Sequence, residues 1–411
     1  MNTKLGSTFG LIFGLVHSWV LLAGCGGGSP GGLGEDPTDP GTTSGAEEPE
    51  LATESSGLVP EGESSGELES DESSGGSPSE PTEPEPEPWV WTLPSWFPEP
   101  YVPEDNPMSV SKVALGRHLF YDERLSGDQT VSCATCHRQE LAFTDGLAQA
   151  EGVTGQVHPR GSMALANVAY AATLAWADPT LVDLEEHALG PMFAQEPIVE
   201  MGLKSAEQLL DRLRDEPRYT ELFAAAYPGQ ADPVTLDNVT RALATFQRSL
   251  ISANSPFDRW FYGGDEEAMS PAAKRGWELF TFRGECHYCH FGLNLSDSLY
   301  FPGMSVPGMS VPGMSLPGMS VPGMSVPGMS DRHPVFHNTA LYNEDGEGAY
   351  PPGNEGLYAF TGQPEDMGKF KSPTLRNIVQ TAPYMHDGSI DTLEEVIDHY
   401  AEGGACGPPA R

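Results

Sequence analysis

The strongest constraint on this sequence is a Cys-x-x-Cys-His pattern that occurs twice, at residues 133–137 and 286–290. The pattern is typical of covalent haem c attachment: its two thiols bond the haem vinyl groups, and its histidine binds the iron from the proximal side. A zinc site or a redox-active cysteine pair shares part of this spacing, but two copies that both end in His favour haem. We therefore predict two covalently bound haem c groups, attached through Cys133, Cys136 and His137 and through Cys286, Cys289 and His290.

The spacing of apolar residues predicts a mainly α fold. Thr235–Ile251 has apolar residues on one helical face, and Ser270-Pro271 is typical of a helix start. Gly263-Gly264 interrupts the chain between the two Cys-x-x-Cys-His patterns. We expect two cytochrome c-like haem domains packed around an inter-haem interface. Their predicted ranges are 89–263 and 264–404, followed by a tail at 405–411 that contains Cys406.

The N-terminus reads as an export signal. Lys4 precedes an apolar stretch from Phe9 to Leu22 that is short and interrupted for a membrane span. It ends in Leu-Ala-Gly before Cys25, which resembles a bacterial lipobox. The sequence thus predicts a signal peptide at 1–25 that is cleaved before Cys25, and a lipid on this cysteine. The alternative is a plain secretory signal. We expect an exported lipoprotein on the periplasmic face of the outer membrane or on the cell surface.

Two segments have a biased composition. Residues 26–88 are rich in Gly, Ser, Pro, Glu and Thr, with too few large apolar residues to bury a core, and predict a disordered acidic tether. Residues 302–330 repeat Pro-Gly-Met-Ser-Val within the second predicted domain. Turn-forming Pro-Gly predicts an exposed loop insertion. Either its thioethers bind Cu(I), a soft ion, or the repeat is a tolerated expansion, which we favour.

The charge balance limits the choice of partners. The 411 residues carry a formal net charge of −38, and Lys and Arg are missing between Cys25 and Lys112. Nucleic-acid binding needs clusters of these two residue types, so we expect no nucleic acid as a partner.

Several segments resemble one known family. Leu-Gly-Arg-His-Leu-Phe-Tyr-Asp at 115–122, Arg-Leu-Ser at 124–126 and the first haem motif are similar to the opening of the di-haem cytochrome c peroxidase/MauG family. Ser-Pro-Thr-Leu-Arg-Asn at 372–377 and the segment 381–389 resemble its C-terminal signature. The resemblance covers about residues 89 to 404. Segments 158–163, 166–170, 191–193 and 336–343 are most similar to the MbnH (methanobactin-associated) branch.

The resemblance implies roles around the first haem, which His137 would hold in the peroxidatic domain. Many relatives place a blocking His ligand where this chain has Val153, so this haem is expected to be open; His158 lies nearby. Glu200 would be the distal acid, with Glu196 as the alternative. His187 takes the place of a distal Gln, and Pro191 would shape the distal wall.

Around the second haem, the resemblance implies iron ligation by His290 and by Tyr400, where the peroxidases have Met and MauG has Tyr. His399, Met385 and Met367 remain alternatives. Trp176 matches a Trp placed between the haems, which can relay oxidising equivalents. Thr381 and Pro383 match the ligands of an inter-haem calcium ion, although Gly161 replaces the usual Asn.

The implied activity is peroxide-dependent oxidation. Hydrogen peroxide would produce a high-valent di-haem state, which oxidises a Trp to kynurenine in a copper-binding partner of the MbnP type. One alternative is a periplasmic di-haem cytochrome c peroxidase that detoxifies peroxide with electrons from a small cytochrome. The other is a di-haem cytochrome that only transfers electrons.

Overall fold

The computed structural model describes residues 85–300 and 335–406, except the side chain of Cys406. The predicted signal peptide with Cys25, nearly all of the tether and the Met repeat therefore lie outside the described residues. Within the described ranges, no helix is both long and apolar enough to cross a membrane.

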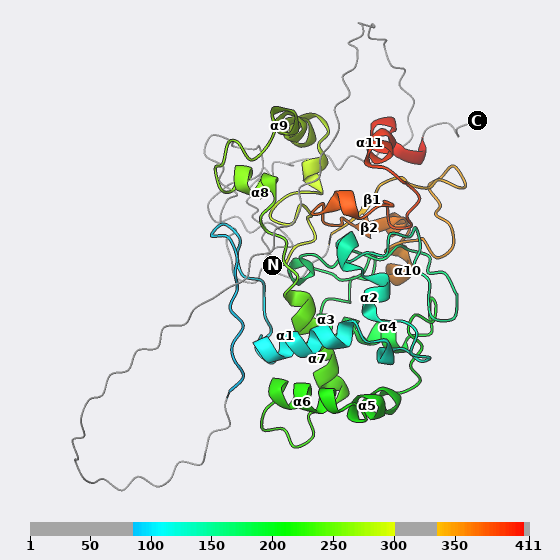
Figure 1. The fold of residues 1–411 in the computed structure, drawn as a ribbon. Helices are drawn as coiled ribbons and strands as arrows, with labels where there is room; N and C mark the ends of the chain where they lie inside the picture. Colours follow the sequence, from blue (N-terminus) through cyan, green and yellow to red (C-terminus); the bar gives the residue numbers. More distant parts are fainter. Residues whose placement is uncertain (1–84, 301–334, 407–411) are drawn as a thin grey trace, which may run out of the picture. The chain divides into compact units, whose positions relative to one another are not determined.

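The described part of the chain is mainly helical, as predicted (Figure 1). Up to residue 261 the α-helices are α1 (Val110–Phe120), α2 (Cys133–Cys136), α3 (Leu184–His187), α4 (Leu189–Phe193), α5 (Ala206–Arg214), α6 (Pro217–Ala226), α7 (Leu236–Arg248) and α8 (Pro256–Phe261). The later ones are α9 (Pro271–Glu278), α10 (Tyr358–Thr361) and α11 (Leu393–Glu402). Short helical turns include η4 (Leu279–Arg283) and η5 (Cys286–Tyr288).

Local capping explains where several helices begin. The Thr235 hydroxyl accepts a hydrogen bond from the backbone amide of Asn238 at the start of α7. The Ser270 hydroxyl accepts one from the backbone amide of Ala273 at the start of α9. A capping box at Thr392 opens α11. The starts of α7 and α9 agree with the helices expected from the sequence.

The sheet of the described residues is small. Strand β1 (Phe336–Asn338) pairs antiparallel with β2 (Lys369–Lys371), so that His337 faces Phe370. The β2 backbone continues into the other half of the chain, because the Lys371 amide donates to the Trp176 carbonyl at 2.9 Å. This contact brings residues from both predicted haem domains together.

The largest apolar core of the described residues lies where α1 crosses α7, with α5 and α6 beside them (Figure 1). Leu115, Leu119, Phe223 and Leu243 are almost fully buried there. Gly116 lets the two helices approach, since a Cβ at this position would lie 1.9 Å from the Ala242 carbonyl oxygen. The core thus supports the segment that leads into the first haem motif.

Buried ion pairs connect elements that are distant in sequence. Arg376 makes two 2.8 Å contacts to the Asp258 carboxylate and donates to the Leu293 carbonyl. Both side chains are almost inaccessible to solvent. The pair spans the predicted boundary at residues 263 and 264, which itself stays a prediction.

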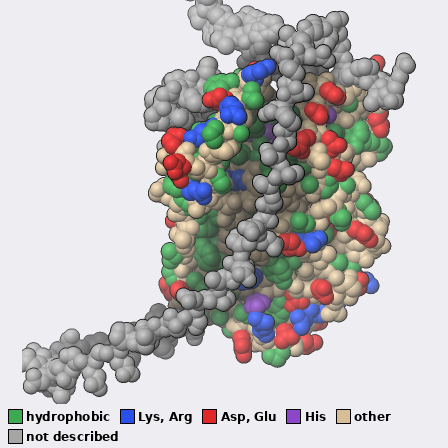
Figure 2. All heavy atoms as spheres, turned by 45° about the horizontal axis from the view of Figure 1, so that its top comes forward, with side chains coloured by type: hydrophobic (Ala, Val, Ile, Leu, Met, Phe, Trp, Pro, Cys, Tyr) green, Lys and Arg blue, Asp and Glu red, His purple; other side chains and the backbone are tan. Residues whose placement is uncertain are grey.

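Charged side chains are mixed on the surface. On the face shown in Figure 2, acidic side chains are spread among basic and apolar ones. The Lys and Arg side chains seen there stand singly or in small groups.

Candidate functional site

The first Cys-x-x-Cys-His motif forms the short helix α2, with His137 at its end. The His137 Nδ1 atom lies 2.8 Å from the Phe143 carbonyl oxygen, an acceptor that suits an Nδ1–H donor. Such a bond fixes the tautomer and leaves Nε2 to bind a metal. Burial lowers the pKa of His137, which favours the neutral ligand form.

The second motif repeats this arrangement. His290 follows the turn η5, and its Nδ1 atom lies 3.1 Å from the Leu295 carbonyl oxygen. Burial lowers the pKa of His290 as well. Phe143 and Leu295 both have positive φ, so each backbone turns back to present its carbonyl to the histidine. The residues of both motifs therefore fit a haem iron ligated by Nε2.

The cysteines of the first motif lack the properties of a reactive thiol pair. Burial raises the pKa of Cys133 to about 12 and that of Cys136 to about 11. A redox-active pair needs a lowered thiol pKa, because the thiolate is the reactive form. The environment thus suits thiols consumed in haem thioether bonds better than a redox centre.

A cavity beside the first motif extends to the second one, since Thr144 and Asp145 line it together with Asn294 and Ser296. Its empty volume is about 1050 Å³, open solvent included, and His187, Trp176, Lys371, Thr381 and Pro383 are among its lining residues. Burial and the charges of His137 and Lys371 lower the pKa of His187 to about 4. His187 is therefore neutral near pH 7 and close enough to His137 to act on the same haem.

Glu200 lies near the same motif and differs from Glu196 in its burial. Glu200 is half-buried and burial raises its pKa, whereas Glu196 is exposed. The charge of Glu200 also contributes to the raised pKa of Cys133 and of Cys136. Of the two carboxylates, Glu200 is therefore the half-buried one near the first motif.

Backbone hydrogen bonds hold Glu200 in place. The Met201 amide donates to the Pro191 carbonyl at 3.0 Å, and the Val153 amide donates to the Glu200 carbonyl at 2.7 Å. Pro191 and Val153 are thus both attached to the segment that carries the candidate acid. The Nδ1 atom of the nearby His158 contacts the Arg160 backbone, at 3.1 Å from the amide nitrogen and 3.2 Å from the carbonyl oxygen.

Trp176 lies at the junction of the two halves of the chain. Its indole Nε1–H donates to the Gly161 carbonyl at 2.9 Å, and it packs against a cluster that contains Tyr350 and Phe370. It also lines the cavity beside the first motif. This place is compatible with the predicted relay between haems.

Two neighbouring residues of α11 were candidates for the second iron, and their contacts differ. The His399 Nε2–H donates to the Thr339 carbonyl at 2.9 Å, so this nitrogen is occupied. Tyr400 is half-exposed, and burial together with the charges of Cys289 and Cys286 raises its pKa to about 12. Its phenol is therefore close to the second motif.

The two methionine alternatives lie in other places. Met385 lines the same cavity as His187 and Trp176. Met367 packs against the cluster that contains Tyr350 and Phe370.

The calcium prediction is not tested by these contacts. Thr381 and Pro383 lie together on the cavity wall, but the Thr381 hydroxyl donates to the Ile378 carbonyl at 3.1 Å. The Gly161 carbonyl, which could replace the usual Asn, accepts from Trp176.

Sequence reasoning assigned no role to an Asp–His pair at the second motif. The His337 Nε2–H donates to the Asp297 carboxylate at 2.5 Å, and the Asp297 amide donates to the Cys289 carbonyl at 2.8 Å. This bond with Asp297 raises the pKa of His337 to about 10. His337 belongs to segment 336–343, and the family resemblance of this segment was the sequence signal that could have pointed to the pair.

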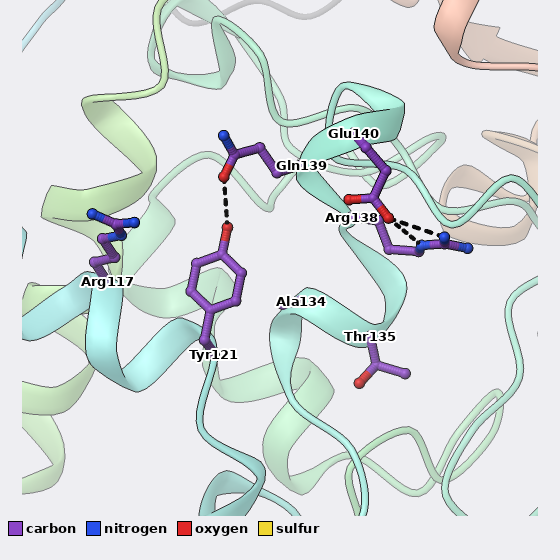
Figure 3. Close-up of a pocket in the computed structure, with 7 residues that line it drawn as sticks. All are labelled: Arg117, Tyr121, Ala134, Thr135, Arg138, Gln139 and Glu140. Carbon is purple, nitrogen blue, oxygen red and sulfur yellow. Dashed lines mark hydrogen bonds and ion pairs between the residues drawn. The ribbon is translucent and has the colours of Figure 1, made fainter. Parts of the chain in front are cut away.

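A separate hollow borders the outward residues of the first motif (Figure 3). Ala134 and Thr135 line it together with Tyr121, whose hydroxyl donates to Gln139 at 3.2 Å. Among the predicted catalytic residues, His187 and Trp176 line the other cavity, whereas Glu200 and Pro191 are not part of the lining of either one.

Comparisons with known proteins agree with this arrangement. The model of the di-haem cytochrome c peroxidase family matches residues 110–267. The chain is 35% identical to the methylamine utilization protein MauG of Methylorubrum extorquens over 308 residues, which are 74% of this chain and 73% of that protein. It is 30% identical to the cytochrome c551 peroxidase of Pseudomonas aeruginosa over 293 residues, 71% of this chain and 72% of that protein.

Comparison with solved structures points to the same family. A MauG-like protein associated with microbial copper homeostasis is 43% identical, with a TM-score of 0.66 over 79% of this chain and 86% of that one. The di-haem peroxidase BthA of Burkholderia thailandensis shares the fold, with 20% identity and a TM-score of 0.53 over 72% of each chain. From these relationships and the two motifs, the chain belongs to the di-haem cytochrome c peroxidase/MauG family of haem oxidoreductases.

Proposed function

We propose that this protein uses hydrogen peroxide to oxidise a Trp side chain, giving kynurenine, in a copper-binding partner of the MbnP type. The observation that carries the proposal is the 43% identity, over 79% of the chain, to a MauG-like protein associated with microbial copper homeostasis. The Met repeat at 302–330 would suit a copper-rich setting, but the proposal does not depend on it.

Peroxide needs an open face on the first haem. Val153 cannot bind iron, and His158 is not among the residues that line the cavity of His187. Within the described part of the chain, the imidazole that faces this cavity from its lining is His187. Its low pKa keeps it neutral, so it can hydrogen-bond a small ligand.

Glu200 is proposed to move the peroxide proton. Burial raises the pKa of its carboxyl group, which brings it closer to the working pH of a general acid–base catalyst. It would accept a proton from the near oxygen of the incoming peroxide and return it to the leaving oxygen. Pro191 would limit the space on this side.

The two haems, when bound, supply the reaction with peroxide and hold the oxidising equivalents. His137 and His290 would each hold one iron through Nε2, and Tyr400 would be the second ligand on the haem of His290. Trp176 would connect the two sites through its indole ring. Thr381 and Pro383 would contribute to a calcium site if that ion is bound.

The site of action is proposed to be outside the cytoplasm. Cleavage before Cys25 and lipidation of this residue would attach the protein to a membrane, and residues 26–88 would provide reach toward a membrane-associated or soluble partner.

The test is mass spectrometry of the partner. The conversion is a four-electron oxidation of the indole ring to N-formylkynurenine, whose hydrolysis releases formate, so it consumes two equivalents of hydrogen peroxide. The haem-loaded protein is mixed with a purified copper-binding protein of the MbnP type and with at least two equivalents of hydrogen peroxide, and the partner's Trp peptides are analysed. We expect kynurenine at one Trp, and no modification when peroxide is omitted or when the Glu200→Gln variant is used. An unmodified partner combined with rapid peroxide-dependent oxidation of a reduced small cytochrome would contradict the proposal.

That outcome would favour the peroxide-detoxifying alternative, which the 30% identity to the cytochrome c551 peroxidase of Pseudomonas aeruginosa keeps open. A protein that ignores peroxide altogether would instead act as an electron-transfer cytochrome.

A further inference from the structure

Arg160 is a half-buried cation with an unpartnered nitrogen. Its Nη2 donates to the Gly353 carbonyl at 3.3 Å, while its Nε is buried and has no partner among the described residues. Burial lowers the pKa of this guanidinium, and the charges of Glu355 and Asp178 oppose this effect only in part. A buried charge is costly unless an opposite charge compensates it.

His386 adds a second unpartnered nitrogen beside Arg160. Only 5% of its surface is exposed, and its Nε2 has no partner among the described residues. Its ring stacks on Phe370, with 3.6 Å between the ring centroids and an angle of 12° between the planes. The Arg160 guanidinium lies 5.5 Å from the centroid of the same Phe370 ring. Two unsatisfied groups therefore meet around one aromatic side chain.

The acidic residues nearby are already engaged. Asp387 accepts hydrogen bonds from the Tyr342 hydroxyl and the Ser389 amide. Glu355 accepts from the Gly353 amide at 2.9 Å, and Asp178 accepts from Thr180. Among the described residues none of them forms an ion pair with Arg160. The charges of Glu355 and Asp178 partly offset the burial of the guanidinium, but they leave its Nε without a partner, and a carboxylate from outside the polypeptide can supply one.

We propose that Arg160 and His386 bind a propionate carboxylate of the second haem. Guanidinium matches a carboxylate in shape and charge, and an imidazole N–H can complete the contact. The proposal rests on the two haems of the family and is independent of the oxidised substrate.

The position favours the haem of His290 over that of His137. The His386 ring stacks on Phe370, and Phe370 pairs in the sheet with His337. His337 in turn bonds to Asp297, whose amide donates to the carbonyl of Cys289 in the second motif. The pair is thus connected through this short sheet to the second motif.

The test compares Arg160→Gln with Arg160→Lys in the haem-loaded protein. Haem content is normalised by the pyridine haemochrome, the midpoint potential of each haem is measured by optical titration, and propionate bending bands are recorded by resonance Raman. We expect Arg160→Gln to lower the potential of the His290 haem and shift its propionate bands, because an unpaired carboxylate stabilises ferric iron. Arg160→Lys should keep most of the potential.

Arg214→Gln is the matched control, because Arg214 is exposed and its ion pair with Asp232 lies at the surface. It should change neither potential. His386→Phe provides a second test with the stacking on Phe370 retained, and should shift the same propionate bands. Unchanged potentials and bands in both Arg160→Gln and His386→Phe would overturn the proposal, as would a shift confined to the His137 haem. Potentials of the unaltered protein that depend on added phosphate or chloride would identify a free anion instead of a propionate, and would also overturn it.

Discussion

Two carboxylates in one short segment competed for the role of distal acid, and burial distinguishes them. The side chain of Glu196 points to solvent, while Glu200 is half-buried near Cys133 and Cys136. Sequence spacing alone could not choose between them, because the chain turns between the two positions. The choice depends on how Pro191 and Val153 hold the Glu200 backbone.

Replacing Glu200 by Gln should slow the reaction with peroxide. The amide keeps the size of the side chain but cannot exchange a proton, and general acid–base catalysis contributes about 100- to 10,000-fold to such steps. The measurement is the rate of the optical change after mixing with peroxide. Glu196→Gln is the control and should react at the unaltered rate; a slow Glu196→Gln with a normal Glu200→Gln would reverse the assignment.

Tyr400→Met should raise the reduction potential of the second haem, because a thioether stabilises ferric iron less than a phenolate does. The peroxide-treated protein should also return faster to its resting spectrum. His399→Gln serves as control, since Gln can still donate to the Thr339 carbonyl. Ligand-field bands that change with His399→Gln and not with Tyr400→Met would assign the iron ligand to His399.

At the scale of elements, the crossing of α1 and α7 depends on one glycine. Gly116 faces the Ala242 carbonyl so closely that a methyl group would overlap it. This requirement could not be predicted from the sequence, because it depends on how two helices far apart in the chain approach each other.

Gly116→Ala should therefore destabilise the protein by about 1–3 kcal/mol, the usual cost of overpacking a core. Chemical denaturation followed by circular dichroism measures this change. Gly276→Ala in α9 is a matched helical control, because the added methyl group meets nothing within 4 Å. It should be neutral or stabilising, since alanine has the higher helix propensity. Equal effects at the two positions would contradict the packing argument.

Sequence patterns predicted some elements well and missed others for physical reasons. The capped helices α7, α9 and α11 have local start signals, which do not depend on tertiary structure. Residues 184–193 instead form two short helices, α3 and α4, without a side-chain hydrogen bond at either cap. The pairing of β1 with β2 was missed, because each strand has only three residues and the two are far apart in sequence.

The candidate site also contains some residues that the sequence identifies and others that it does not. Cys133, His137 and their counterparts belong to a local motif, so the sequence was sufficient to identify them. The Asp297–His337 pair and the buried Lys371 depend on contacts between distant segments. Burial lowers the pKa of Lys371 to about 8, a property that no local pattern indicates.

At the scale of the whole molecule, the buried Arg376–Asp258 pair joins residues from both predicted haem domains. Arg376→Met should cost about 3–5 kcal/mol of unfolding free energy, because it leaves a buried carboxylate without its partner. Denaturant unfolding measures this cost. The double variant with Asp258→Asn should recover part of the loss, and a double variant as unstable as the sum of both single ones would contradict the coupling.

This ion pair also predicts how acid affects stability. Burial alone would raise the pKa of Asp258, but the hydrogen bonds and charge of Arg376 hold it below its usual value. A depressed folded-state pKa stabilises the protein above the unfolded-state pKa and loses this contribution as the pH falls through the folded value. The unaltered protein should therefore lose stability below about pH 4, near the unfolded pKa of Asp. The double variant should lose less over the same range.

The central claim concerns the whole molecule: two haems are attached, and only one has an open iron. The most direct measurement is electron paramagnetic resonance of the resting ferric protein, with haem content from the pyridine haemochrome. The account predicts two haems per chain, one high-spin and one low-spin, and loss of both ferric signals after one equivalent of peroxide. Fewer than two haems, or two low-spin signals that peroxide leaves unchanged, would contradict it.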